Sequence, residues 1–489
     1  MKKLLLTSII LLCIVTLGIF PTDMFLFTVP EWVIYTLLGV IAALVVLLFL
    51  KQKKKAPRIT AVILTVITAV TSVVAIRIDP YFNGISFHRS AEPTLPYDTA
   101  LSADKAIADL DYAMYYLRKL HPKYYNGYIA SPEKMADWME SEIEKAGSVT
   151  VNELTAYISR VFSVLGDAHT SASFRYADML YLKHYYRRQS GGWKIKAIND
   201  TTIKELLTEK AGLFSFEAES WELETMKQYL ISVQGLDYLG FDVSGGITYT
   251  YENDDGEVQS ETYFPEDFVT YDEYITYNGE DSTKDSRNEA FVRFTIDDEK
   301  SLAILTLDEC NFNEEYINCL RDMFTQVKQK GIRNVAVDLR ENGGGNDQVA
   351  VEFIRYLDTD EYDYASETMR LGFFMTALSE DHKINARYND LTFTGNVYIL
   401  TSSASFSSAM LFAQYIKDNR LGTLIGEPPG NDPNGYGDIS TFCTPNAGIR
   451  FSISTKHFFR ADKNCADKYV MPDVECDADN AVDMLYNMI

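Results

Sequence analysis

The chain has 489 residues, of which 47% are hydrophobic and 23% charged, so it is long enough for several domains and its composition is typical of a folded protein. Its formal net charge of −24 argues against nucleic acid as a partner, because phosphate binding requires clustered Lys and Arg. Residues 1–58 nevertheless carry seven Lys and Arg against two acids, whereas the rest of the chain is strongly acidic. This change in charge along the chain predicts a membrane boundary between the two parts.

Three uncharged apolar segments are predicted to cross a membrane, because each is long enough to span the hydrocarbon core as a helix. They are Leu4–Phe20, Trp32–Leu50 and Ile59–Ile76. The loop at 51–58 is densely basic, whereas the loop between the first two segments has no Lys or Arg. The positive-inside rule then places the N-terminus and the 51–58 loop in the cytoplasm. Residues 1–77 are therefore predicted to be a multi-pass anchor in the cell membrane, with everything after Arg77 on the extracytoplasmic side.

The next two segments lead from the membrane to the body of the protein. Residues 78–100 contain three prolines and are predicted to be a linker. Residues 101–170 have helical periodicity, and Thr150 with Glu153 forms a capping-box pattern at the start of the last helix. That helix is predicted to end at the small-residue turn Gly166-Asp167-Ala168-His169-Thr170.

Residues 171–300 are predicted to form a β-rich accessory module. Alternating apolar residues from Trp193 to Ala197 indicate a strand, which the Asn199-Asp200 turn joins to a helix. The later part alternates polar with aromatic or β-branched residues, and Asp254-Asp255-Gly256 marks a hairpin turn.

Residues 301–489 alternate between strand and helix patterns, which predicts an α/β core. One buried strand leads into the loop Asp338-Leu-Arg-Glu-Asn-Gly-Gly-Gly-Asn346. Its glycines permit close backbone approach, and its exposed N–H groups could stabilise an oxyanion. Taken alone, the loop is equally typical of a structural turn, and it lacks the spacing of a phosphate-binding loop.

A second strand, Val397–Leu400, leads into Thr401-Ser-Ser-Ala-Ser-Phe-Ser-Ser-Ala-Met410 and then a helix. A hydroxyl held at a helix N-terminus is suited to nucleophilic attack, because the free N–H groups and the helix dipole favour a developing negative charge. The same residues are also typical of a Ser-rich helix cap with no chemical role.

The histidines and cysteines show no metal-binding spacing, so neither a metal nor another cofactor is expected. His169 is the leading candidate for a base because a turn after a helix can direct its ring into a cleft. Lys456 and His457 are the rival bases. A Cys465–Cys476 disulfide is compatible with an oxidising compartment, although the odd number of cysteines after Cys13 argues against a disulfide scaffold.

The turn at 166–170, the glycine loop at 338–346 and the serine turn at 401–410, with Ile425-Gly-Glu-Pro-Pro-Gly430 behind it, resemble in this order the S41 family of serine peptidases. This family includes the C-terminal processing (tail-specific) and tricorn-core proteases. The resemblance covers roughly residues 100–480. It implies a crotonase-like ββα core at 301–489, preceded by a helical region and a PDZ-like insert.

The resemblance places the nucleophile at Ser407, with Ser402, Ser403, Ser405 and Ser408 as alternatives. It places the oxyanion hole at the backbone N–H groups of Gly344 and Ser408.

The base implied by the resemblance depends on the subtype. Peptidases of the Ser–Lys type carry a lysine at a position that falls near Asp432 here, and no lysine lies between Lys417 and Lys456. The Ser–His type uses a histidine that maps to His169, whose ordinary pKa suits neutral conditions.

A third, orienting acid is expected by the logic of catalytic triads. Glu427 and Asp467 are candidates by region, and Asp167 is close in sequence to His169.

The leading hypothesis is a membrane-anchored, extracytoplasmic serine endopeptidase that cleaves proteins or peptides without a cofactor. The alternative is a catalytically inactive, peptide-binding pseudo-peptidase at the membrane surface. An acyl hydrolase or transferase acting on a CoA-type substrate ranks last because it would need a phosphate-binding loop. The expected partners are a peptide or protein substrate and the lipid bilayer, with no nucleic acid, and the sequence makes no prediction of oligomeric state.

Overall fold

The computed structural model describes residues 2–25, 31–78, 95–173, 179–183, 193–253, 255–280, 290–371, 374–377 and 381–489. Most of the predicted linker lies outside these described residues.

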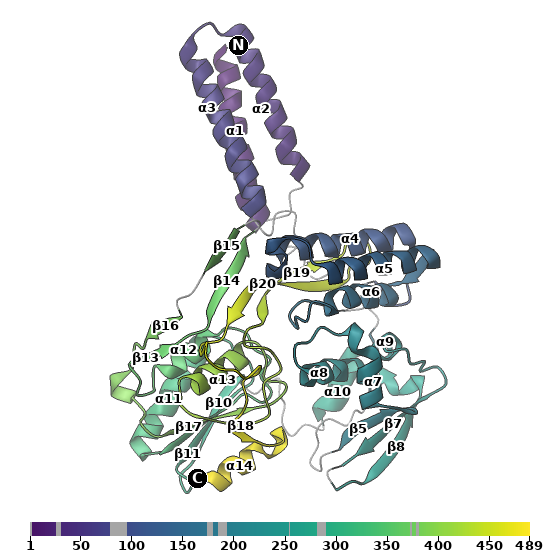
Figure 1. Ribbon diagram of the computed structural model, residues 1–489, viewed down its shortest axis with the longest axis vertical. Coiled ribbons are helices and arrows are strands. Elements are labelled where there is room, and N and C mark those ends of the chain that lie inside the picture. The colour runs from purple at the N-terminus through teal and green to yellow at the C-terminus, as the bar shows by residue number, and fades with distance from the viewer. Residues whose placement is uncertain are drawn as a thin grey trace.

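The N-terminal segment forms three helices that pack side by side (Figure 1): α1 (Lys2–Phe25), α2 (Glu31–Lys51) and α3 (Lys55–Ile78). Each contains a stretch of 18 to 22 residues that is long and apolar enough to cross a membrane, at the positions predicted from the sequence. Ile9, Ile41 and Leu48 are buried between the helices, whereas Leu11 and Val66 are exposed. An apolar outer face of this kind is expected of helices surrounded by lipid.

Three further helices make the predicted N-terminal helical region: α4 (Ala103–Leu120), α5 (Ala130–Ala146) and α6 (Val151–Ser163). The Thr150–Glu153 capping box at the start of α6 is present. After α6 the chain turns and forms β3 (Ser171–Ser173), which pairs with β20 (Arg450–Phe459) of the C-terminal part. His169 is therefore held between the end of a buried helix and a strand.

The accessory module contains a four-stranded antiparallel sheet in the order β6-β5-β7-β8. The strands are β5 (Lys194–Ile198), β6 (Thr201–Thr202), β7 (Ile247–Glu252) and β8 (Val258–Tyr263). The predicted strand, following helix and hairpin are confirmed. The β-rich description is incomplete, because the module also holds α7 (Ile203–Lys210), α8 (Glu219–Tyr229), α9 (Val233–Tyr238) and α10 (Tyr271–Glu280). Their apolar residues, including Leu206, Met226 and Leu236, share one core with Tyr249 and Tyr251 of the sheet.

The C-terminal part is the predicted α/β core, built on a six-stranded sheet in the order β10-β11-β12-β17-β18-β21. Its strands are β10 (Val292–Asp297), β11 (Leu302–Leu307), β12 (Asn334–Asp338), β17 (Asn396–Thr401), β18 (Thr423–Gly426) and β21 (Val474–Glu475). β10 is antiparallel to β11, and the other neighbours are parallel.

Helices cover both faces of this sheet. Val335 and Val337 of β12 pack on α11 (Glu314–Lys330), α12 (Gln348–Ile354) and α13 (Ser408–Asp418), whereas Ala336 faces α14 (Ala481–Met488). This alternation follows from the two-residue period of a strand.

A second sheet, in the order β15-β14-β20-β19, closes the site from the other side. Its remaining strands are β14 (Ser366–Leu371), β15 (Phe374–Ala377) and β19 (Tyr436–Cys443). The glycine loop follows β12 and the serine turn follows β17, so both leave the carboxyl ends of neighbouring parallel strands, where open α/β sheets bind ligands. All six cysteines are free thiols, so the Cys465–Cys476 disulfide is not formed.

Candidate active site

Ser407 lies in the sharp turn between β17 and α13, at the N-cap position of the helix. Its backbone has φ 55° and ψ −118°, in a region that side-chain-bearing residues rarely occupy. Such strain persists only where surrounding contacts hold it, and it is common at functional sites. One of these contacts is the backbone N–H of Ser407, which donates to Oδ1 of the buried Asn431 at 2.8 Å.

Hydrogen bonding separates Ser407 from the other four serines of the turn. Three of those four hydroxyls donate to backbone carbonyl oxygens: Ser402 to Arg340, Ser405 to Leu339 and Ser408 to Gly345. The fourth, Ser403, donates to Oε1 of Glu224. The Ser407 hydroxyl has no hydrogen-bond partner among the described residues, and this half-buried side chain lines a cavity.

The glycine loop lies directly beneath this turn. Gly344 has φ +105°, and a Cβ at this position would lie 2.7 Å from Cβ of Ser407 and 2.8 Å from the carbonyl oxygen of Phe406. The structure thus brings together the two segments expected to form the oxyanion hole. The N–H of Gly344, however, donates to Oδ1 of Asn342 at 2.8 Å, so this amide is already occupied. Among the described residues, the N–H groups of Gly345 and Ser408 have no acceptor.

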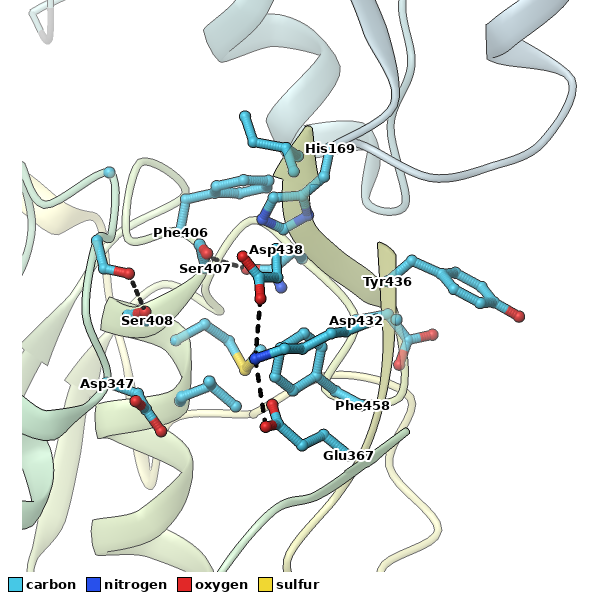
Figure 2. Close-up of a pocket in the computed structure, with 18 of the residues that line it drawn as sticks. His169, Asp347, Glu367, Phe406, Ser407, Ser408, Asp432, Tyr436, Asp438 and Phe458 are labelled. Atoms are coloured by element: carbon cyan, nitrogen blue, oxygen red, sulfur yellow. Dashed lines mark hydrogen bonds and ion pairs between the residues drawn. The ribbon is translucent and has the colours of Figure 1, made fainter. Parts of the chain in front are cut away.

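His169 lines the same cavity as Ser407, and the two side chains lie on either side of Phe406 in Figure 2. The His169 ring packs on the Phe406 ring, with centroids 4.5 Å apart. Both ring nitrogens are buried, and neither has a hydrogen-bond partner in the part of the chain that the structure describes. Burial lowers the pKa of His169, and the nearby negative charge of Asp167 acts in the opposite direction. The ring is therefore neutral, and available as a base, at neutral pH.

Asp167, two residues before His169, is buried and accepts three hydrogen bonds. Its carboxylate accepts from Nε2 of His121 at 2.9 Å, from Oγ1 of Thr170 at 2.6 Å and from the backbone N–H of His169 at 3.0 Å. Burial acts to raise the pKa of Asp167, but the hydrogen bond from His121 and the neighbouring imidazoles outweigh it and lower the pKa. Asp167 thus fixes the backbone of the turn that carries His169.

Glu217, from the accessory module, completes a group of three side chains. One ring nitrogen of His169 and one carboxylate oxygen each of Asp167 and Glu217 lie within 4.8 Å of one another. Among the described residues, this is the one group whose ligand types and spacing could hold a metal ion. Asp167 already accepts three hydrogen bonds, so only one of its about four lone-pair sites stays open to such an ion.

The two acids expected from the sequence have other partners. Glu427 accepts from the backbone N–H groups of Ser403 and Ala478, each at 3.1 Å, and so ties the serine turn to the C-terminal segment. Asp467 uses its carbonyl oxygen to accept from Arg460. Neither belongs to the group around His169.

The rival bases are placed less favourably. Lys456 lines the cavity and forms ion pairs with Asp438 at 2.8 Å and Glu367 at 3.3 Å (Figure 2). Burial acts to lower the pKa of Lys456, but these two partners raise it above its ordinary value, so the amine stays protonated. His457 is not among the residues that line the cavity, and its Nε2 lies 3.1 Å from the carbonyl oxygen of Asn434.

The cavity itself is about 640 Å³ and is acidic. Met410, Leu411 and Phe458 supply an apolar part of its wall, and Lys456 is its only cation among the described lining residues. Its carboxylates come from four segments: Asp347, Glu367, Asp432 and Asp438.

Three residues that contact these groups were not predicted from the sequence. Asn342 belongs to the glycine loop, but its bond to Gly344 depends on the loop conformation. Asn431 and Glu217 carry no motif of their own. They reach the site only because distant segments pack together, so no spacing rule could have found them.

Comparison with known proteins agrees with this geometry. Residues 302–476 match the family model for peptidase family S41. Among solved structures, a CPAF mutant has a TM-score of 0.56 at 11% identity, covering 79% of this chain and 95% of that chain. Mature CPAF complexed with lactacystin has a TM-score of 0.54 at 12% identity, covering 79% and 96%. A search of curated proteins found no significant match.

At these identities the structural similarities show a shared fold. The family match covers the glycine loop, the serine turn and the Gly-Glu motif behind it. Residues 302–476 therefore form a serine-type peptidase domain that matches family S41.

Proposed function

We propose that this protein is a membrane-anchored endopeptidase in which Ser407 is the nucleophile and His169 the general base. The observation that carries the proposal is the convergence of a strained serine with a free hydroxyl and a buried, unpartnered histidine on one cavity. A serine hydroxyl is a weak nucleophile and needs a base close by. Catalytic hydrogen bonds are often long before substrate binds, so a serine and histidine that share a cavity without a direct bond fit this role.

In this mechanism Ser407 Oγ attacks the peptide carbonyl carbon while its proton passes to His169. The tetrahedral intermediate collapses, the C–N bond breaks, and His169 returns the proton to the leaving amine. Water then hydrolyses the acyl-enzyme with the same base. Lys456 does not act as the base because its ion pairs keep it protonated.

The oxyanion would be held by the backbone N–H groups of Ser408 and Gly345. Neither N–H has an acceptor among the described residues, and Gly345 and Ser408 line the same cavity as Ser407. This assignment replaces Gly344 as the second donor, because Gly344 donates to Asn342. The role of Gly344 becomes steric: without a Cβ, the loop can lie against the nucleophile turn.

The three apolar helices would anchor the peptidase in the membrane, with its body on the extracytoplasmic side. The support is the length and composition of the helices and the basic loop between α2 and α3. The substrates would be proteins or peptides that reach this side of the membrane.

The test uses the full-length protein in detergent and two assays. A fluorophosphonate probe labels an activated serine, and fluorogenic casein reports peptide-bond cleavage. Ser407→Ala is expected to abolish labelling, and Ser407→Ala and His169→Ala are each expected to reduce casein cleavage by at least about 10³-fold, as for other catalytic serines and histidines. Lys456→Arg keeps the positive charge but cannot act as a base, so it should retain activity. Cleavage that survives Ser407→Ala would overturn the mechanism, and absence of all labelling in the unmodified protein would favour the pseudo-peptidase.

A further inference from the structure

The acids expected from the sequence make their hydrogen bonds away from the ring of His169. Glu427 is bound to two backbone amides of its own neighbourhood. Asp167 is next to His169, but its carboxylate already accepts three hydrogen bonds, and the one from His169 comes from the backbone N–H and not from the ring. An imidazole that gains a proton during catalysis needs an acceptor with a free lone pair.

Glu217 has such a free oxygen. It lies in the accessory module, in the short segment before α8. Its Oε2 accepts from the backbone N–H of Asp432 at 2.6 Å, whereas its Oε1 is buried with no hydrogen-bond partner among the described residues. The same holds for both ring nitrogens of His169. One ring nitrogen of His169 lies within 4.8 Å of a carboxylate oxygen of Glu217, so two groups with unused hydrogen-bonding capacity are buried side by side.

The backbone around Glu217 is fixed by several contacts with the core. Its carbonyl oxygen accepts from the hydroxyl of Tyr469 at 2.8 Å and from Nζ of Lys468 at 3.5 Å. Four residues later, Trp221 stacks on Phe406 with ring centroids 3.8 Å apart, and Phe406 in turn packs on His169. This segment of the module therefore places a carboxyl group near His169 and an aromatic ring on Phe406, the residue that packs on His169.

We propose that Glu217 is the positioning residue for His169, so that the accessory module supplies the acid of the catalytic triad. The inference rests on the proposed function of Ser407 and His169. When His169 takes the proton of Ser407, the ionised Glu217 accepts a hydrogen bond from the second ring nitrogen and stabilises the imidazolium. Glu217 keeps its charge throughout, and the proton leaves with the amine.

The ionisation of Glu217 gives this role a pH signature. Burial, followed by the negative charge of Asp167, raises the pKa of Glu217 to about 8. Burial lowers the pKa of His169. Between the lowered pKa of His169 and about pH 8 both groups are neutral, and above about pH 8 an ionised Glu217 faces a neutral imidazole. The other charged or titratable groups that act on Glu217 are Lys123, Asp432, Tyr436 and Lys468.

The experiment measures the rate of fluorophosphonate labelling of the full-length protein in detergent between pH 5.5 and 9.5, at several probe concentrations. In the unmodified protein the rate should rise with pH through an inflection near pH 8. Glu217→Gln should lower the limiting rate by about 100-fold or more, as loss of the acid does in other triads, with little change in the half-saturating probe concentration. Its inflection should move to below pH 6.5, because burial lowers the pKa of His169 and the base is then the group that limits the rate.

Two variants separate this role from a structural one. Glu222→Gln removes another buried acid of α8, whose pKa is also raised to about 7 by burial, and should leave the rate and inflection unchanged. Glu217→Asp keeps the carboxylate and should recover part of the rate together with the basic inflection.

The outcomes distinguish this inference from the proposed function. Ser407-dependent labelling of Glu217→Gln at the unmodified rate, with the same inflection, would overturn the role of Glu217 and leave the peptidase mechanism intact. Equal losses in Glu217→Gln and Glu217→Asp, with the inflection unmoved, would also overturn it, because only packing would then matter. No labelling in the unmodified protein would mean that the proposed function itself is wrong.

Discussion

At the scale of single residues, Gly343 and Gly344 are adjacent but experience different constraints. A Cβ on Gly344 would lie within 2.8 Å of Ser407 and Phe406, and its φ of +105° disfavours any side chain. A Cβ on Gly343 meets nothing within 4 Å, and its φ lies outside that region. We expect Gly344→Ala to reduce fluorophosphonate labelling by at least about 100-fold, because the serine turn must shift and with it the oxyanion donors. Gly343→Ala should label within about two-fold of the unmodified protein.

The residues around Ser407 also show which features of single residues could be predicted from the sequence. The order of the three motifs led to Ser407 through a family resemblance, and the backbone strain and free hydroxyl of Ser407 support that choice. The family resemblance implied that the backbone N–H of Gly344 is an oxyanion donor. In the structure this N–H donates to Asn342, and a sequence motif does not reveal such a hydrogen bond. Glu217 could not be predicted at all, since it comes from another module and joins His169 only through tertiary packing.

At the scale of elements, the buried His121–Asp167 pair joins three parts of the fold. His121 lies between α4 and the following turn, Asp167 follows α6, and Thr170, which donates to Asp167, also accepts from the backbone N–H of Ser454 in β20. Burial lowers the pKa of His121 despite the hydrogen bond to Asp167. His121 is thus neutral when folded and binds a proton more readily when unfolded.

The pair therefore predicts acid sensitivity. Because the unfolded state binds more protons below the ordinary histidine pKa of 6.5, stability should fall as the pH drops from 7.5 to 5.5. The loss per pH unit is at most about 1.4 kcal/mol for one proton. His121→Gln can keep both side-chain hydrogen bonds without titrating, so its thermal midpoint in detergent should depend less on pH. The exposed His382→Gln is the control, because contacts with Asp363 and Glu361 raise rather than lower the pKa of His382. An unchanged pH dependence in His121→Gln would contradict this account.

Elements with strong periodicity or a cap were predicted well from the sequence, including the three apolar helices, the capped α6 and the strands that lead into the glycine loop and the serine turn. The helices α8 and α9 were missed. Their burial comes from packing on the sheet of the module, and α8 has little amphipathic pattern to indicate it. The omission mattered because the segment before α8 carries Glu217.

At the scale of the whole molecule, the charge distribution predicts the orientation in the membrane. The 51–58 loop holds five Lys and Arg, and moving such a loop across the bilayer is disfavoured. With an odd number of spans we expect the termini on opposite sides, and therefore the peptidase body outside the cytoplasm. We expect an epitope tag appended after Ile489 to bind antibody on intact cells, and a tag inserted after Lys53 to bind only after permeabilisation. A cytoplasmic marker that stays unstained on intact cells is the control. The reverse pattern would put the cavity and its acidic wall in the cytoplasm, and the substrates would then have to be cytoplasmic proteins.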